Sequence, residues 1–147
     1  MIVLDAYPVV GLLRDEPVAD EVQALLESGT PAWLTPLGVA EVVDRRVRLD
    51  AVDPEAVFVN LVQFGLANPM PLDSRTAARA GALRARHYHR TTRSVSLADC
   101  VVAETARAAQ ARVATSDPHL LDLCADEGIQ TIPLPDSRGH RWTPRAT

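Results

Sequence analysis

The sequence contains no lysine, because all 15 of its Lys and Arg residues are arginines. This absence excludes any mechanism that needs a lysine side chain. Positive charge is also in deficit overall. The formal net charge is −4 at pH 7, so the chain as a whole produces no positive field that would attract nucleic acid. A nucleic-acid site would need a local basic surface.

Cysteine is scarce as well. Cys100 and Cys124 lie on separate predicted helices, without the number or the spacing of a disulfide framework or a zinc site. No apolar run approaches the ~20 residues of a membrane span, so we expect no association with a membrane. The opening M-I-V-L-D carries an acid where a signal peptide carries basic residues. We therefore expect a protein of the reducing cytoplasm.

Short apolar runs alternate with amphipathic segments along the chain. With 147 residues, of which 47% are apolar and 23% charged, it is expected to form one globular domain. The expected strands are 2–4, 33–34, 70–72, 112–116 and 129–132. The expected helices are 6–13, 18–28, 36–49, 54–64, 97–110 and 118–126, together with a long helix that Ser74 caps and that runs to about residue 90. This order predicts an α/β fold over residues 1–134, with a central parallel sheet of about five short strands and helices on both faces. Residues 135–147 are polar and rich in proline, and we expect a loose tail.

The stretch from residue 94 to 121 carries two carboxylates at the boundaries of its predicted elements. Ser96 is a favourable helix N-cap, and Asp99 stands three residues later in a capping-box position. Apolar residues three, four and seven positions beyond Asp99 place its side chain on the inward face of the helix. Asp117 ends a predicted strand and precedes Pro118, which suits the first turn of a helix. Each acid could be only a helix cap, and the functional interpretation depends on whether other carboxylates reach the same place.

Two further acids are predicted to reach that place. Asp5 ends the first predicted strand, as Asp117 ends a later one, and parallel strands bring their carboxyl ends to the same edge of the sheet. Glu41 lies in the second turn of the helix after the second strand, and its alternative role is an exposed ion pair with Arg45. Four carboxylates in one cleft would repel one another and raise their pKa values. A divalent cation would reduce this repulsion, and a site whose ligands are all oxygen atoms favours Mg²⁺ or Mn²⁺ over Zn²⁺.

Four short motifs in this order resemble the PIN domain, and more narrowly the VapC-type toxins of toxin–antitoxin pairs. The motifs are V-L-D ending at Asp5, A-E at Glu41, L-A-D at Asp99 and T-S-D at Asp117. The resemblance implies that these four acids bind Mg²⁺ or Mn²⁺ and catalyse cleavage of single-stranded regions of RNA. It also implies a supporting role for Thr115, a homodimer, and a VapB-type antitoxin as partner. Such a site activates water, so we expect products with a 5′-phosphate and a 3′-hydroxyl.

Arginines and aromatic residues cluster on the helix predicted for residues 74–90 and just beyond it. Four of these arginines are predicted to lie close to one helical face and to form a nucleic-acid surface, in which guanidinium groups bind phosphate. They are Arg79, Arg86, Arg90 and Arg93. A solvated helix face is the alternative interpretation.

Three other protein classes gather acids on an α/β framework. A dehalogenase-type phosphatase needs a second Asp two residues after the first, where this chain has Tyr7. A response-regulator receiver needs a lysine, which is absent. The remaining alternative is a catalytically silent PIN-like module that binds RNA or protein.

Overall fold

The computed structural model describes residues 1–67 and 71–145. Within them, short parallel strands form a sheet in the order β2-β1-β3-β4. The strands are β1 (Ile2–Leu4), β2 (Ala32–Leu34), β3 (Arg112–Thr115) and β4 (Thr131–Pro133). The predicted fold class, an α/β parallel sheet covered by helices, is confirmed.

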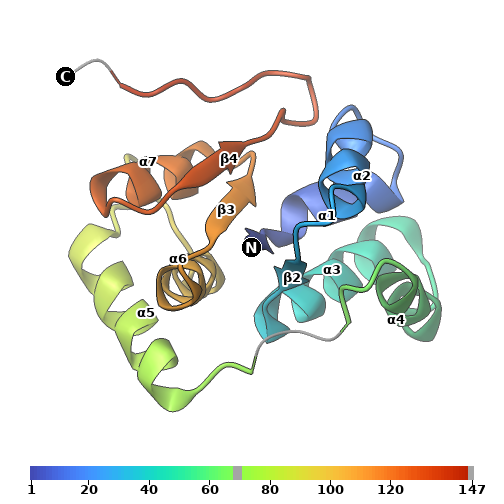
Figure 1. Ribbon diagram of the computed structural model, residues 1–147, viewed down its shortest axis with the longest axis horizontal. Helices are drawn as coiled ribbons and strands as arrows, with labels where there is room; N and C mark the ends of the chain where they lie inside the picture. The colour runs from blue at the N-terminus through green and yellow to red at the C-terminus, as the bar shows by residue number, and fades with distance from the viewer. Residues whose placement is uncertain (68–70, 146–147) are drawn as a thin grey trace.

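Helices cover both faces of this sheet, because successive side chains of a buried strand point to opposite sides. Ile2 and Leu4 of β1 pack into one core with α1 (Ala6–Leu13), α2 (Ala19–Glu27), α3 (Pro36–Asp50) and α4 (Pro54–Gln63). Val3 packs into the opposite core with α5 (Ser74–His87), α6 (Leu97–Ala109) and α7 (Pro118–Asp126). Figure 1 shows α1–α4 on one side of the strands and α5 and α6 on the other.

The strand predicted over 70–72 is not part of this sheet. Met70 lies outside the described residues, and Pro71 and Leu72 belong to no strand. Pro71 has no N–H to donate to a ladder. Leu72 instead packs beside the core formed with α5–α7. The apolar character of Leu72 therefore reflects packing against this core and not strand formation.

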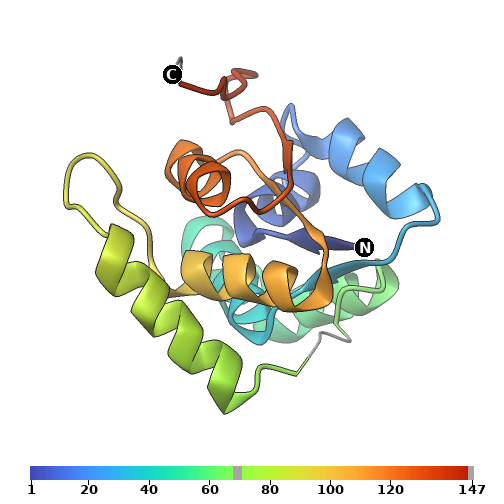
Figure 2. The same cartoon turned by 60° about the vertical axis from the view of Figure 1, so that its left-hand side comes forward.

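Helix α5 differs from its prediction at both ends. Its N-cap is Asp73 and not Ser74, because the Asp73 carboxylate accepts a hydrogen bond of 2.7 Å from the Thr76 N–H. The helix ends at His87 and does not continue to residue 90. His89 and Arg93 then pair as an isolated antiparallel bridge. Figure 2 shows the resulting loop projecting beyond the end of α5.

The segment after β4 has no helix or strand among residues 135–145, yet side chains tie it to the domain. The Trp142 indole N–H donates to Asp122 Oδ1 at 2.9 Å, and Arg145 lies 3.1 Å from the other oxygen of Asp122. Arg141 pairs with Glu21 on α2. The tail that the sequence predicts to be loose therefore has three side-chain anchors on α2 and α7.

The architecture places two of the predicted site residues side by side. Strands β1 and β3 are hydrogen-bonded neighbours, with Leu4 opposite Ala114. Asp5 follows the end of β1, and Asp117 follows the end of β3 by two residues. Both acids therefore lie at the carboxyl edge of the sheet.

Within residues 1–67 and 71–145, no helix has the length and apolar character needed to cross a membrane.

Candidate active site

The carboxyl edge of the sheet opens into a cavity of about 460 Å³. All four acids predicted from the sequence line it: Asp5, Glu41, Asp99 and Asp117. They come from the β1–α1 junction, α3, α6 and the β3–α7 junction, so the fold joins residues that are far apart in the chain. A fifth carboxylate, Asp136, reaches the cavity from the C-terminal segment.

Asp5 is the most buried of the four predicted acids, with 5% of its surface exposed. One carboxylate oxygen accepts a hydrogen bond of 2.8 Å from the N–H of Ala6, which opens α1. The other accepts one of 2.7 Å from the hydroxyl of Thr115, a fully buried residue of β3. The Thr115 hydroxyl oxygen in turn accepts from the Asp117 N–H at 3.0 Å. Thr115 therefore fixes the Asp5 carboxylate and the backbone of Asp117 together.

Asp99 and Asp117 are helix caps and cavity residues at once. The Asp99 carboxylate accepts from the Ser96 N–H at 2.7 Å, and the Ser96 hydroxyl accepts from the Asp99 N–H, which completes a capping box. Asp117 caps α7 by accepting from the His119 N–H at 2.8 Å. The sequence suggested capping as the alternative to a functional role. In the structure both residues cap helices and also line the cavity, because a carboxylate that accepts a cap hydrogen bond through one oxygen still has a second oxygen.

Glu41 lies in the second turn of α3 and is partly exposed. Its alternative role, an ion pair with Arg45, is not found: among the described residues Glu41 forms no ion pair within 4.0 Å. The Arg45 guanidinium instead lies over the ring of Tyr7, 5.3 Å from its centroid.

Burial and mutual repulsion raise the pKa values of three of these acids. Burial raises the pKa of Asp5 to about 7, and the nearby charges of Asp99, Asp117 and Glu41 add to the rise, while the Thr115 hydrogen bond opposes it. Burial, and then the charge of Asp99, also raises the pKa of Glu41. The pKa of Asp99 is raised by burial and by Asp117, against the hydrogen bonds from Ser96. The cavity therefore concentrates negative charge that an opposite charge would stabilise.

The donor set fits a hard divalent cation, because it consists of carboxylate oxygens that repel one another. The four predicted acids could serve as ligands. As the side chains stand, however, no three His, Cys, Asp or Glu side chains in the described part of the chain are arranged to hold a metal ion. Binding would require the carboxylates to turn toward a common point.

Comparison with known proteins identifies the family. The model of the PIN domain matches residues 2–125. The chain belongs to the PIN domain family. PIN domains are generally nucleases that use divalent metal ions. No curated protein matches the chain.

Two solved structures share the PIN fold of this chain. FitAcB from Neisseria gonorrhoeae is 22% identical, with a TM-score of 0.64, and the match covers 89% of this chain and 96% of that one. A toxin–antitoxin complex from Klebsiella pneumoniae is 16% identical, with a TM-score of 0.60, covering 80% of this chain and 87% of that one.

Sequence reasoning missed several residues that line the cavity of this PIN domain. They are Tyr7, Ser116, Asp136 and Ser137, together with Arg45, for which the sequence predicts only an ion pair with Glu41. Tyr7 and Ser116 stand beside predicted acids in the chain, and that adjacency could have indicated them. Asp136 and Ser137 have no such signal, because their position depends on how the chain returns after β4.

The predicted arginine surface is divided in the structure. Arg79 and Arg86 lie on α5, whereas Arg90 and Arg93 lie beyond its end, so the prediction of four arginines on one helical face is wrong. Arg93 also donates to Asp126 at 2.6 Å, and Arg86 lies 3.4 Å from Glu127. Their binding of nucleic acid remains a prediction, and two of the four are already in ion pairs.

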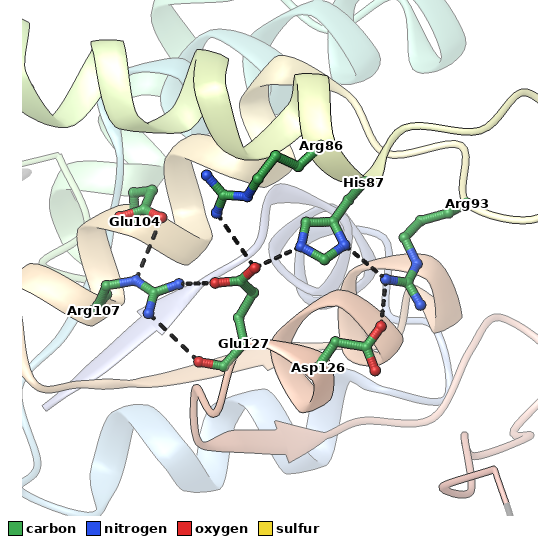
Figure 3. A network of polar contacts seen from close by, with 7 residues as sticks. All are labelled: Arg86, His87, Arg93, Glu104, Arg107, Asp126 and Glu127. Atoms are coloured by element: carbon green, nitrogen blue, oxygen red, sulfur yellow. Dashed lines mark hydrogen bonds and ion pairs between the residues drawn. The ribbon is translucent and has the colours of Figure 1, made fainter.

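Those ion pairs belong to a network that joins α5, α6 and the end of α7 (Figure 3). Glu127 accepts from Arg107 at 2.6 Å and contacts His87 Nε2 at 2.5 Å. His87 Nδ1 faces an Arg93 nitrogen at 3.1 Å, and arginine can only donate. His87 thus lies between the Glu127 carboxylate and the Arg93 guanidinium and links the two.

We expect Glu127→Gln to lower the free energy of unfolding by about 1–2 kcal/mol at pH 7, because it weakens charged hydrogen bonds that are partly screened by water. The His87 hydrogen bond, followed by those from Arg107 and Arg86, holds the pKa of Glu127 at about 2, below its ordinary 4.5. Because the folded state lowers the pKa of Glu127, ionised Glu127 stabilises the fold at pH values above 4.5. This stabilisation is lost as the pH falls from 4.5 toward 2. Urea unfolding of both proteins at pH 7 and pH 3 tests this, since the difference must shrink in acid.

The matched control is Asp44→Asn, which removes an exposed ion pair with Arg48 on α3. We expect it to change stability by less than about 0.5 kcal/mol. Equal effects of the two substitutions would mean that the network in Figure 3 contributes no more than a surface pair.

Proposed function

We propose that this PIN domain is a Mg²⁺- or Mn²⁺-dependent endoribonuclease that hydrolyses phosphodiester bonds in single-stranded regions of RNA. The observation that carries the proposal is the convergence of four carboxylates on one cavity, where burial and repulsion raise the pKa values of three of them. An acid cluster of this kind is unfavourable without a cation, so its retention in the fold supports a metal-dependent site.

In this proposal Asp5, Glu41, Asp99 and Asp117 hold the cation. When bound, the cation would polarise the phosphodiester and lower the pKa of water for in-line attack. The Thr115 hydroxyl keeps the Asp5 carboxylate in place through its 2.7 Å hydrogen bond. Backbone N–H groups at the starts of α1, α6 and α7 donate hydrogen bonds to the carboxylates of Asp5, Asp99 and Asp117 and so help to hold these side chains in position.

We further propose that the protein is the toxin of a VapBC-type pair, acts as a homodimer and is neutralised by a VapB-type antitoxin. The fold it shares with FitAcB and with the Klebsiella toxin–antitoxin complex supports this assignment. The acidic cavity favours an antitoxin segment with basic side chains, which would take the place of the cation. A complex that keeps full nuclease activity would contradict this mode of neutralisation.

The form of the products tests the proposed chemistry. We expect cleavage of single-stranded RNA in Mn²⁺ to leave a 5′-phosphate and a 3′-hydroxyl, with no cleavage in EDTA. A metal-free ribonuclease would need a general base and a general acid at the site, and among the described residues no histidine lines this cavity. End-labelling of the fragments, with and without phosphatase treatment, distinguishes the outcomes. A 2′,3′-cyclic phosphate, or cleavage that persists in EDTA, would move the active site away from the acids.

A catalytically silent PIN-like module that binds RNA or protein is the second candidate. It is favoured by one observation, that no three acids among the described residues are already arranged around a common point. Thermal unfolding with and without Mn²⁺ separates the candidates, because a ligand of the folded state must raise the melting temperature. A melting temperature that Mn²⁺ leaves unchanged would support the silent module.

A further inference from the structure

Arg45 is the single basic side chain in the lining of the acidic cavity, as far as residues 1–67 and 71–145 define it. It follows Glu41 by one turn of α3. The neighbouring arginines of the same helix are paired: Arg46 with Asp50, and Arg48 with Asp44 at 3.2 Å. Arg45 has no carboxylate partner within 4.0 Å among the described residues, although acids surround it. Its position therefore needs another explanation.

Tyr7 supplies the contact that holds this guanidinium. The Arg45 Cζ atom lies over the Tyr7 ring, 5.3 Å from its centroid, and Tyr7 stands two residues after Asp5. A cation–π contact uses the face of the guanidinium and leaves its N–H donors free. The charge of Arg45 also lowers the pKa values of Glu41 and Asp99 against the effect of burial. Arg45 thus lies within electrostatic reach of two acids, with donors available for a third group.

We propose that Arg45 is the phosphate-binding residue of this cavity, and that Tyr7 holds its guanidinium so that it donates to the non-bridging oxygens of an RNA phosphodiester. The inference rests on the proposed function and names the residue that receives the substrate. Five carboxylates line the cavity, so an RNA phosphate would be repelled even after a divalent cation had neutralised two charges. The planar fork of arginine matches two phosphate oxygens, and its fixed position reduces the entropy lost on binding.

The alternative role for Arg45 is to offset repulsion among the acids without touching RNA. The two roles differ in what Mn²⁺ does. A charge-offsetting arginine becomes dispensable once Mn²⁺ saturates the acids, whereas a phosphate-binding arginine is still needed. Removing Arg45 also removes a cation that competes with Mn²⁺, so metal binding should not weaken in either case.

The test compares Arg45→Gln, Arg45→Lys and Tyr7→Leu with Arg48→Gln. Arg48→Gln removes the same charge from the same helix outside the cavity. At saturating Mn²⁺ we expect Arg45→Gln to lower kcat/KM on a single-stranded RNA oligonucleotide by on the order of 10²-fold. Arg45→Lys should recover only part of this loss, because it lacks the fork. Tyr7→Leu should lose about tenfold, because it removes the ring that contacts the guanidinium. Arg48→Gln should be unchanged. The rise in melting temperature that Mn²⁺ causes without RNA should be at least as large in Arg45→Gln as in wild type.

Loss of activity that disappears at saturating Mn²⁺, or that Arg48→Gln shares, would overturn the proposal. Equilibrium binding, at saturating Mn²⁺, of a fluorescein-labelled single-stranded RNA whose phosphorothioate linkages resist hydrolysis gives a measurement that does not depend on cleavage. Binding at least tenfold weaker in Arg45→Gln than in Arg48→Gln supports the proposal, and equal binding contradicts it. If the wild type binds RNA without cleaving it or responding to Mn²⁺, the proposed nuclease function fails while this comparison still decides the role of Arg45.

Discussion

Asp99→Asn is expected to reduce RNA cleavage by on the order of 10²–10³-fold without lowering the melting temperature. The substitution removes a charge from a cluster in which Asp99 raises the pKa values of Asp5 and Glu41. Asparagine keeps a carbonyl oxygen that can still accept the 2.7 Å hydrogen bond from the Ser96 N–H, so the capping box is retained in part. In EDTA the variant should be as stable as the wild type or more stable. Cleavage assays in Mn²⁺ and thermal unfolding in EDTA measure the two effects separately.

Two comparisons separate charge from capping at Asp99. Asp99→Ala removes the cap as well and should cost about 1 kcal/mol of stability. Asp73→Asn is the matched control, because Asp73 caps α5 through its carboxylate and does not line the cavity. It should leave cleavage unchanged. If Asp99→Asn cleaves RNA as the wild type does, or loses several degrees of melting temperature in EDTA, Asp99 is only a structural cap.

The sequence predicted that the four acids lie together, because local signals coincide with the carboxyl edge of the sheet. The apolar run 2–4 ends at Asp5, and Asp117-Pro118 marks the change from β3 to α7. An Asp before a proline both ends a strand and begins a helix, so its place can be read without tertiary information. The order of short strands and helices then brings these ends together. The four acids are therefore found in one cavity, although their roles in metal binding and catalysis remain predictions.

Local signals failed where a tertiary contact decides the outcome. Arg45 stands four residues after Glu41, a spacing that suits an ion pair, but Tyr7 from α1 contacts its guanidinium. The sequence predicts that the helix of α5 continues to residue 90. The helix ends at His87, because His89 pairs with Arg93 and the chain leaves the helical path. The composition of the tail does not predict its contacts with the domain. Trp142 binds Asp122 of α7, which lies 20 residues earlier in the chain, so no local pattern indicates the contact.

As the pH increases toward 7, the affinity for Mn²⁺ is expected to increase roughly tenfold per pH unit. Above pH 7 it should level off. The pKa of Asp5 is about 7 in the metal-free protein, against an ordinary value of 3.8. A cation needs the ionised carboxylate, so binding below pH 7 must displace a proton from Asp5. The same shift makes the metal-free protein less stable as the pH rises from 3.8 to about 7, because the folded state holds a proton that the unfolded state releases. Mn²⁺ titrations followed by thermal unfolding, from pH 5.5 to 8, measure both trends.

Thr115→Val identifies the source of this pH dependence. The Thr115 hydroxyl donates the one side-chain hydrogen bond that lowers the pKa of Asp5, and valine fills a similar volume without it. The variant should therefore shift the inflection in Mn²⁺ affinity to a pH above 7, with weaker binding at neutral pH and recovery toward wild-type affinity in alkali. An affinity that does not vary between pH 5.5 and 8 in the wild type would contradict the prediction, because no group that binds Mn²⁺ would then titrate in this range. An inflection that Thr115→Val leaves in place would assign the titration to another acid of the cavity, because no other described side chain gives Asp5 a hydrogen bond.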